Sequence, residues 1–107
     1  MFGFGKKKMD KDAWAEAIYG KKLKHPEKES AYQLSALTTG LLLQYHRIIL
    51  DSVQIIRATK NPDTRKGRIE LSHKHHQKML QLKPFCNKEQ LDIIRHAEDA
   101  MRSVKLL

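Results

Sequence analysis

Hydrophobic side chains recur every three or four residues between Ser30 and Lys60, in a stretch that has no proline and only one glycine, Gly40. At 100° per residue, nine of them fall in one sector about 160° wide. These nine are Leu34, Leu37, Leu41, Tyr45, Ile48, Ile49, Val53, Ile55 and Ile56. A helix over residues 30–60 would be about 46 Å long. Its apolar sector is too wide for one neighbour, so we expect it to be the central helix of a bundle.

A short amphipathic pattern precedes this long helix. Trp14 and Ile18 lie four residues apart and would share one face of a helix over residues 12–19, which Gly20 would end. Residues 1–9 contain two glycines, two phenylalanines and three lysines, and nothing nearby for them to bury against. We expect these nine residues to form a flexible tail.

A third helix is predicted over residues 65–82. Asn61 and Pro62 end the long helix, and Asp63 or Thr64 can cap the next one. Six residues of this helix share the expected inner face. They are Ile69, Ser72, His73, His76, Met79 and Leu80.

The last predicted helix covers residues 88–104. Pro84 separates it from the third helix, and Asn87 followed by Gln90 forms a capping box at its start. Its expected inner residues recur at helical spacing. They are Ile93, Ile94, Ala97, Ala100, Met101 and Val104.

These patterns predict an all-α fold, an antiparallel bundle of three long helices plus a short N-terminal helix. A chain of 107 residues fits a single domain over residues 1–107. No apolar run approaches the length of a membrane span. The single cysteine, Cys86, excludes an internal disulfide and agrees with a reducing cytoplasm, where we expect the protein to reside.

The net charge of +9 is concentrated in two places, the N-terminal segment and residues 61–86. The second region carries six basic residues against two acids. The basic residues are Arg65, Lys66, Arg68, Lys74, Lys78 and Lys83. They are candidate contacts for phosphate groups, because basic residues without interleaved aromatic ones suit the nucleic-acid backbone better than its bases. The alternative is charge that only confers solubility.

A second candidate surface is apolar. Tyr32, Leu43 and Leu50 lie outside the main sector of the long helix. Either the N-terminal helix with Trp14 covers them, or they form a patch for self-association. In addition, Phe2, Phe4 and the three lysines within residues 1–8 could make weak contact with a membrane surface.

Metal and catalytic sites have little support. Glu70 and His73 show the Glu-x-x-His spacing of di-iron bundles, but the long helix offers no inward carboxylate to complete such a site. A zinc ion held by His46, His73 and His76 is conceivable, yet hydrogen-bonded structural histidines are the simpler interpretation. Cys86 has no histidine–acid pair tied to it. We therefore expect no metal, no cofactor and no enzymatic activity.

The sequence thus favours a non-catalytic helical module that binds a protein partner or a second copy of itself. The alternative is a nucleic-acid-binding protein that uses the basic helix, residues 65–83, for contacts with the phosphate backbone.

Overall fold

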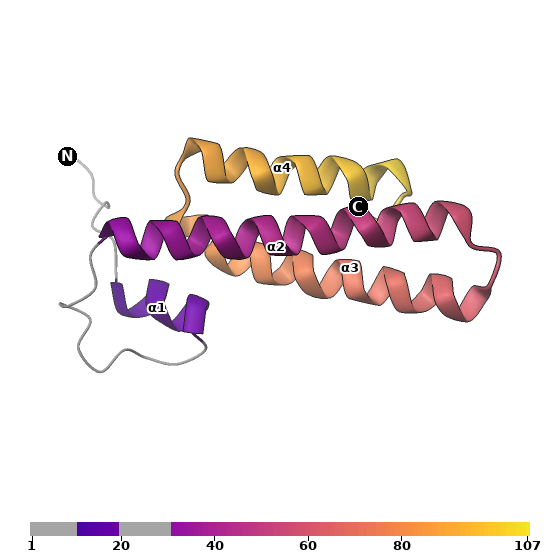
Figure 1. The fold of residues 1–107 in the computed structure, drawn as a ribbon, viewed down its shortest axis with the longest axis horizontal. Coiled ribbons are helices and arrows are strands. Elements are labelled where there is room, and N and C mark those ends of the chain that lie inside the picture. Colours follow the sequence, from indigo (N-terminus) through magenta and orange to yellow (C-terminus); the bar gives the residue numbers. More distant parts are fainter. Residues whose placement is uncertain (1–10, 20–30) are drawn as a thin grey trace.

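The computed structural model of the protein describes residues 11–19 and 31–107. Within these ranges the chain forms four α-helices and one short 3-10 helix. They are α1 (Lys11–Tyr19), α2 (Ala31–Ala58), α3 (Pro62–Leu82), η3 (Lys83–Phe85) and α4 (Lys88–Ser103). Figure 1 shows α2, α3 and α4 side by side with successive directions opposed, and α1 beside the first half of α2. The predicted all-α bundle of three long helices plus a short N-terminal one is confirmed. The predicted tail over residues 1–9 lies outside the described residues.

Helix α2 is the central element, as its wide apolar sector predicts. Both α3 and α4 pack mainly against α2 and touch each other less. The core contains eight buried side chains from the three long helices. They are Leu42, Ile49 and Val53 from α2, Met79 and Leu82 from α3, and Ile94, Ala97 and Met101 from α4. Burying a large apolar side chain contributes roughly 1.5–3 kcal/mol, so these contacts are the main stabilising term of the bundle.

The buried face of α2 is turned relative to the predicted sector. Leu37, which the pattern places inside, is 41% exposed, whereas Leu42 is fully buried together with the polar Thr38. Because α3 and α4 both lie against α2, the buried arc is set by the position of these two neighbours. The small polar residues Thr38 and Ser52 are therefore buried along with the apolar side chains of α2.

Helix α3 begins three residues earlier than predicted, at Pro62. Its N-cap is Asn61, whose side chain accepts hydrogen bonds from the backbone amides of Asp63 and Thr64 at 2.8 and 3.2 Å. The expectation that Asp63 or Thr64 caps this helix is therefore wrong. Asn61 is a strong capping residue, and Pro62 suits the first helical position because it has no amide hydrogen to satisfy.

The inner face of α3 also differs from the prediction. His75 is buried beside His76, whereas His73 is only half-buried. The buried positions Ser72, His75, His76, Met79 and Leu82 follow a seven-residue repeat. Since most of this helix is polar, its sequence defines the inward direction weakly, and the contact with α2 decides it.

Helix α4 follows the prediction closely. Asn87 and Gln90 form the expected capping box, with both reciprocal hydrogen bonds at 2.8 Å. The helix ends at Ser103, one residue before the predicted end. Lys105 adopts a left-handed conformation, φ 64°, and the Leu106 amide donates to the carbonyl of Met101. This arrangement is a common way to close a helix C-terminus.

Helix α1 is attached to the bundle through Trp14, which is 2% exposed. Its indole Nε1 donates a hydrogen bond of 2.7 Å to the Thr38 hydroxyl of α2. Its ring stacks on Phe85 of η3, with centroids 5.6 Å apart and planes 8° from parallel. An indole is well suited to this role because it combines a large apolar surface with one donor that finds an acceptor.

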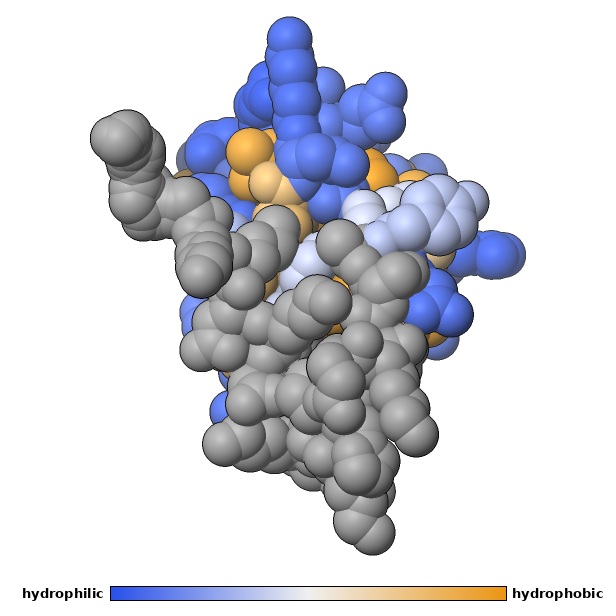
Figure 2. Space-filling view, turned by 90° about the vertical axis from the view of Figure 1, so that its left-hand side faces the viewer, coloured by the Kyte–Doolittle hydropathy of each residue, from blue (hydrophilic) through white to orange (hydrophobic). Residues whose placement is uncertain are grey.

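None of the helices within residues 11–19 and 31–107 is long and apolar enough to cross a membrane. Figure 2 views the bundle from the end at which α2 begins. Hydrophilic side chains make up most of the described surface visible there, and hydrophobic ones appear between them.

Candidate functional site

The six basic residues predicted as one surface do not lie together. Lys74 lies just past the middle of α3 and Lys78 one turn farther on, near its C-terminal end. The Nζ of Lys78 lies over the Tyr45 ring of α2, 5.6 Å from the ring centroid. Lys83 belongs to η3 at one end of the bundle, whereas Arg65 and Lys66 lie in the first turns of α3 at the other end (Figure 1). The charges are therefore distributed along and around α3 and form no continuous strip.

Arg68 is set apart from the other basic residues by its burial. It is half-buried and lines a shallow depression between α2 and α3. The other residues of this depression, Asp51, Gln54, Ile55 and Ala58, come from α2. The Asp51 carboxylate reduces the net charge that Arg68 can offer to an anionic partner.

The basic residues nearest the α2–α3 turn form a more compact group. Arg57, Lys60, Arg65 and Lys66 are all exposed within ten residues of chain, and Asp63 is the one acid among them. We call these four residues the basic tip. Only Arg65 and Lys66 belong to the six basic residues predicted from the sequence. That prediction considered one helix at a time, whereas the tip includes residues on both sides of the turn between α2 and α3.

The predicted apolar patch is partly exposed in the structure. Tyr32 is 82% exposed and Leu43 51% exposed, while Leu50 is half-buried. Trp14, by contrast, is buried against Thr38 and Phe85, so it belongs to the interior and covers neither Tyr32 nor Leu43 fully. Of the two alternatives, complete cover by the N-terminal helix is excluded for these two residues.

The exposed side of α2 contains small residues between its large apolar ones. Gly40 and Ala36 are exposed between Tyr32 and Leu43, and a Cβ atom added to Gly40 would meet nothing within 4 Å. We call Tyr32, Ala36, Gly40, Leu43 and Leu50 the α2 stripe.

The histidines are paired differently from the conceivable zinc trio. His46 of α2 meets His96 of α4, with Nε2 and Nδ1 2.8 Å apart. The pKa of His46 is lowered, mainly because the side chain is partly buried and also because His96 lies next to it. His76 instead donates to the Glu98 carboxylate of α4 at 2.8 Å. Within the described ranges, no group of three or more histidine, cysteine or carboxylate side chains could hold a metal ion.

The geometry of the His46–His96 pair indicates a hydrogen bond. The ring centroids are 5.0 Å apart while the two nitrogens are 2.8 Å apart, so the nitrogens point nearly at each other. Two imidazoles that chelate one ion must instead direct both lone pairs at a third point. The pair is therefore a polar link between α2 and α4.

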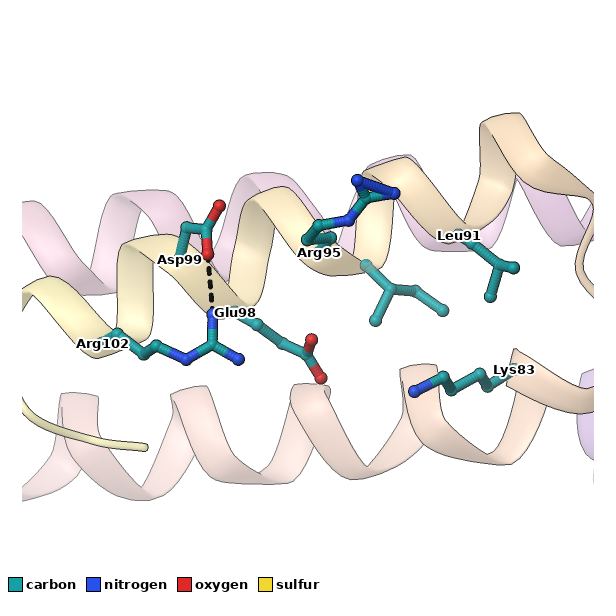
Figure 3. Close-up of a pocket in the computed structure, with 7 residues that line it drawn as sticks. Lys83, Leu91, Arg95, Glu98, Asp99 and Arg102 are labelled. Atoms are coloured by element: carbon teal, nitrogen blue, oxygen red, sulfur yellow. Dashed lines mark hydrogen bonds and ion pairs between the residues drawn. The ribbon is translucent and has the colours of Figure 1, made fainter.

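A groove of about 420 Å³ lies between the α4 surface and η3 (Figure 3). Lys83, Leu91, Ile94, Arg95, Glu98, Asp99 and Arg102 line it. Arg95 pairs with Asp92, and Arg102 with Asp99 at 2.7 Å. The Glu98 side chain points toward α3, where His76 binds it. Three of the five charged residues that line this groove, Arg95, Asp99 and Arg102, therefore have an ion-pair partner.

Cys86 is a poor candidate nucleophile. Its thiol donates to the Leu82 carbonyl at 3.2 Å, and burial raises its pKa to about 11, an effect that Lys83 opposes only weakly. At neutral pH the reactive thiolate would be a very small fraction.

Sequence reasoning missed three contacts between helices, namely His46 with His96, His76 with Glu98, and Gln90 with Ser35 and Thr39. The only available signal was that each polar residue borders an apolar sector.

No family model, curated protein or solved structure matches this chain.

Proposed function

We propose that the protein is a non-catalytic helical interaction module that associates with a second copy of itself through the α2 stripe. The observation that carries this proposal is the exposure of Tyr32 and Leu43, 82% and 51%, on the central helix of the bundle. Burying these apolar side chains in an interface would stabilise the complex by roughly 25 cal/mol for each Å² of apolar surface removed from water.

The small residues of the stripe support contact with another helix. Gly40 and Ala36 would let a second helix approach closely, and the space beyond Gly40 is open. Tyr32 and Leu43 would add larger apolar contacts on either side of these two small residues. Shape alone, however, does not select the partner.

Charge on the same side of α2 favours a second copy as the partner. Arg47 and Asp51 are exposed one helical turn apart. If two α2 helices pack antiparallel about a twofold axis level with Ile49, Arg47 of each copy lies opposite Asp51 of the other. The same register places Gly40 opposite Ala58, so that two small residues meet. Leu43 and Leu50 lie within the overlap of the two helices, whereas Tyr32 extends past the end of the partner's α2 and would contact the partner beyond it. A twofold interface is self-complementary in this way by construction.

A single helix pair buries less surface than the roughly 1,200 Å² typical of stable complexes. The dimer should therefore be weak and depend on concentration. Sedimentation velocity over a wide range of protein concentrations is the appropriate measurement, with the full chain at moderate salt. We expect the sedimentation coefficient to rise with concentration toward that of a dimer.

Two exposed leucines of α2 provide a matched pair of variants. Leu43 lies about 9 Å from the level of Ile49 along the helix, whereas Leu37 lies about 18 Å away, beyond the overlap of the two α2 helices. Leu43→Arg places a charge in the stripe and should keep the protein monomeric. Leu37→Arg makes the same change at a leucine that is 41% exposed outside the stripe, and should leave the dimer intact. Equal effects of the two variants would contradict the proposed face.

The proposed register is tested by exchanging charges. Arg47→Asp alone and Asp51→Arg alone should each weaken the dimer, because like charges then face each other. The double exchange should restore it, since opposite charges meet again. A wild-type protein that stays monomeric at every concentration would overturn the proposal as a whole.

A further inference from the structure

The basic tip at the α2–α3 turn carries an inference that is independent of self-association. Figure 1 shows that the turn between α2 and α3 extends beyond the end of α4. Arg57, Lys60, Arg65 and Lys66 are exposed at this protruding end. They bring four positive charges to an end of the bundle that a large partner could reach.

Neutral groups hold the two arginines of the tip in place. Arg65 Nη1 donates to the Ile56 carbonyl at 2.9 Å, and an Arg57 Nη2 donates to the Ser103 hydroxyl of α4. Each guanidinium has five N–H donors and keeps most of them for another partner. These contacts restrict the side chains without cancelling their charge.

The arginines of α4 show the opposite arrangement. Arg95 is paired with Asp92 and Arg102 with Asp99. Their positive charges are largely compensated within the same helix. Among the described residues, the tip therefore brings four basic side chains without an ion pair together within ten residues of chain, whereas Arg47 and the lysines of α3, η3 and α4 are more widely spaced.

The start of α3 cannot itself act as the anion site. Asn61 already accepts the amides of Asp63 and Thr64, and its carbonyl accepts the amide of Arg65 at 3.0 Å. Pro62 has no amide hydrogen to offer. Any anion at the tip must therefore be bound by side chains, which suits a series of phosphates better than a single small ion.

We propose that the basic tip binds the phosphate backbone of nucleic acid. Arginine forks match phosphate oxygens in pairs, and lysines add charge without demanding a fixed geometry. The described part of the tip contains no aromatic side chain on which a base could stack. Binding should therefore be insensitive to base sequence and steeply dependent on salt, because each neutralised phosphate releases counterions.

The test uses the full-length protein and a fluorescently labelled DNA duplex of mixed sequence. Fluorescence anisotropy gives the affinity at several salt concentrations. The triple variant Arg57→Gln, Lys60→Gln, Lys66→Gln removes three charges from the tip and leaves Arg65 to cap α2. We expect its slope of log affinity against log salt to be smaller by about three.

The matched control removes the same number of charges elsewhere. The triple variant Lys74→Gln, Lys78→Gln, Lys83→Gln has the same net charge as the tip variant but keeps the basic tip. Its salt slope should remain close to that of the wild type. A further variant, Asp63→Asn, removes the one acid of the tip and should strengthen binding.

Several results would overturn the inference. If the salt dependence of the affinity decreases equally in both triple variants, binding depends on the total charge of the protein and not on the basic tip. Absence of duplex binding by the wild type at about 150 mM salt would exclude a functional contact. Binding to vesicles containing anionic lipid, without binding to the duplex, would assign the tip to a membrane surface. The monomeric Leu43→Arg variant should bind the duplex through the same tip, so failure of the dimer proposal leaves this test intact.

Discussion

At the scale of single residues, a position on α2 can be critical or neutral depending on the neighbouring helices. Ile49 is fully buried in the core formed by α2, α3 and α4, whereas Gln44 is exposed on the same helix. Both occupy the interior of a long, regular helix. Differences in their contribution to stability therefore arise from packing.

We predict that Ile49→Ala lowers the free energy of unfolding by about 2–4 kcal/mol, through lost burial and the cavity left behind. Gln44→Ala, which removes an exposed side chain, should change it by less than about 0.5 kcal/mol. Urea melts monitored by circular dichroism measure both values. If Gln44→Ala costs more than Ile49→Ala, the orientation of α2 is wrong.

The His46–His96 link makes stability sensitive to pH. The folded-state pKa of His46 lies below the ordinary value of 6.5, because burial and the neighbouring His96 disfavour its charged form. Well above pH 6.5, His46 is neutral in both the folded and the unfolded protein, so it adds no pH dependence to the free energy of unfolding. As the pH falls below that value, the unfolded chain takes up the proton first, so the folded state loses stability until the folded pKa is passed.

We therefore expect the free energy of unfolding to fall between about pH 7 and pH 5, and to fall less in the variant His46→Gln. Urea melts at a series of pH values measure the difference between the two proteins. His73→Gln, at a half-buried histidine of α3, serves as the control. Parallel curves for the wild type and His46→Gln would show that the link has no energetic effect.

At the scale of elements, Gln90 fixes α4 to α2. It is 2% exposed, and its side-chain oxygen accepts the Asn87 amide while its nitrogen donates to the Ser35 carbonyl and to the Thr39 hydroxyl. One residue thus completes a helix cap and joins two helices. A glutamate has the same shape but cannot donate when it is ionised.

We predict that Gln90→Glu lowers the free energy of unfolding at neutral pH by about 1–3 kcal/mol, because the carboxylate would face the Ser35 carbonyl. Part of this loss should be recovered at low pH, where the protonated acid can donate again. Chemical denaturation at two pH values measures the effect. Gln77→Glu, at an exposed position of α3, is the control and should show neither change.

The elements also show which patterns in a sequence define structure most clearly. Helix α4 and its capping box were predicted to within one residue, since its apolar and polar positions separate cleanly. The start of α3 was misplaced because Asn61, Asp63 and Thr64 are all good capping residues. Only the backbone at Asn61, extended at φ −84° and ψ 116°, decides among them.

At the scale of the whole molecule, the histidines are divided among different contacts. His46 meets His96 between α2 and α4, and His76 meets Glu98 between α3 and α4. His75 donates to the Leu71 carbonyl within α3. These histidines therefore act as separate polar contacts and do not converge on one site.

We accordingly predict that the purified protein, without an affinity tag, carries no stoichiometric metal. Elemental analysis by mass spectrometry provides the measurement, after dialysis without chelator. One zinc or iron per chain that disappears when His73 and His76 are replaced by alanine would contradict this.

The sequence by itself determined the helical class, the central role of α2 and the capped start of α4. Each depends on the order of apolar, polar and capping residues along one segment, which is local information. It also identified Tyr32 and Leu43 as apolar residues outside the main sector of α2.

Only the tertiary structure decided which polar residues meet and where charge remains free. The pairing of His46 with His96, the burial of His75 and the separation of the basic residues of α3 depend on how each helix is rotated against its neighbours. That rotation is set by the combined packing of α2, α3 and α4, because a mostly polar helix such as α3 contains little information about its own inward face. For the same reason the basic tip appears only when the ends of α2 and α3 are seen together.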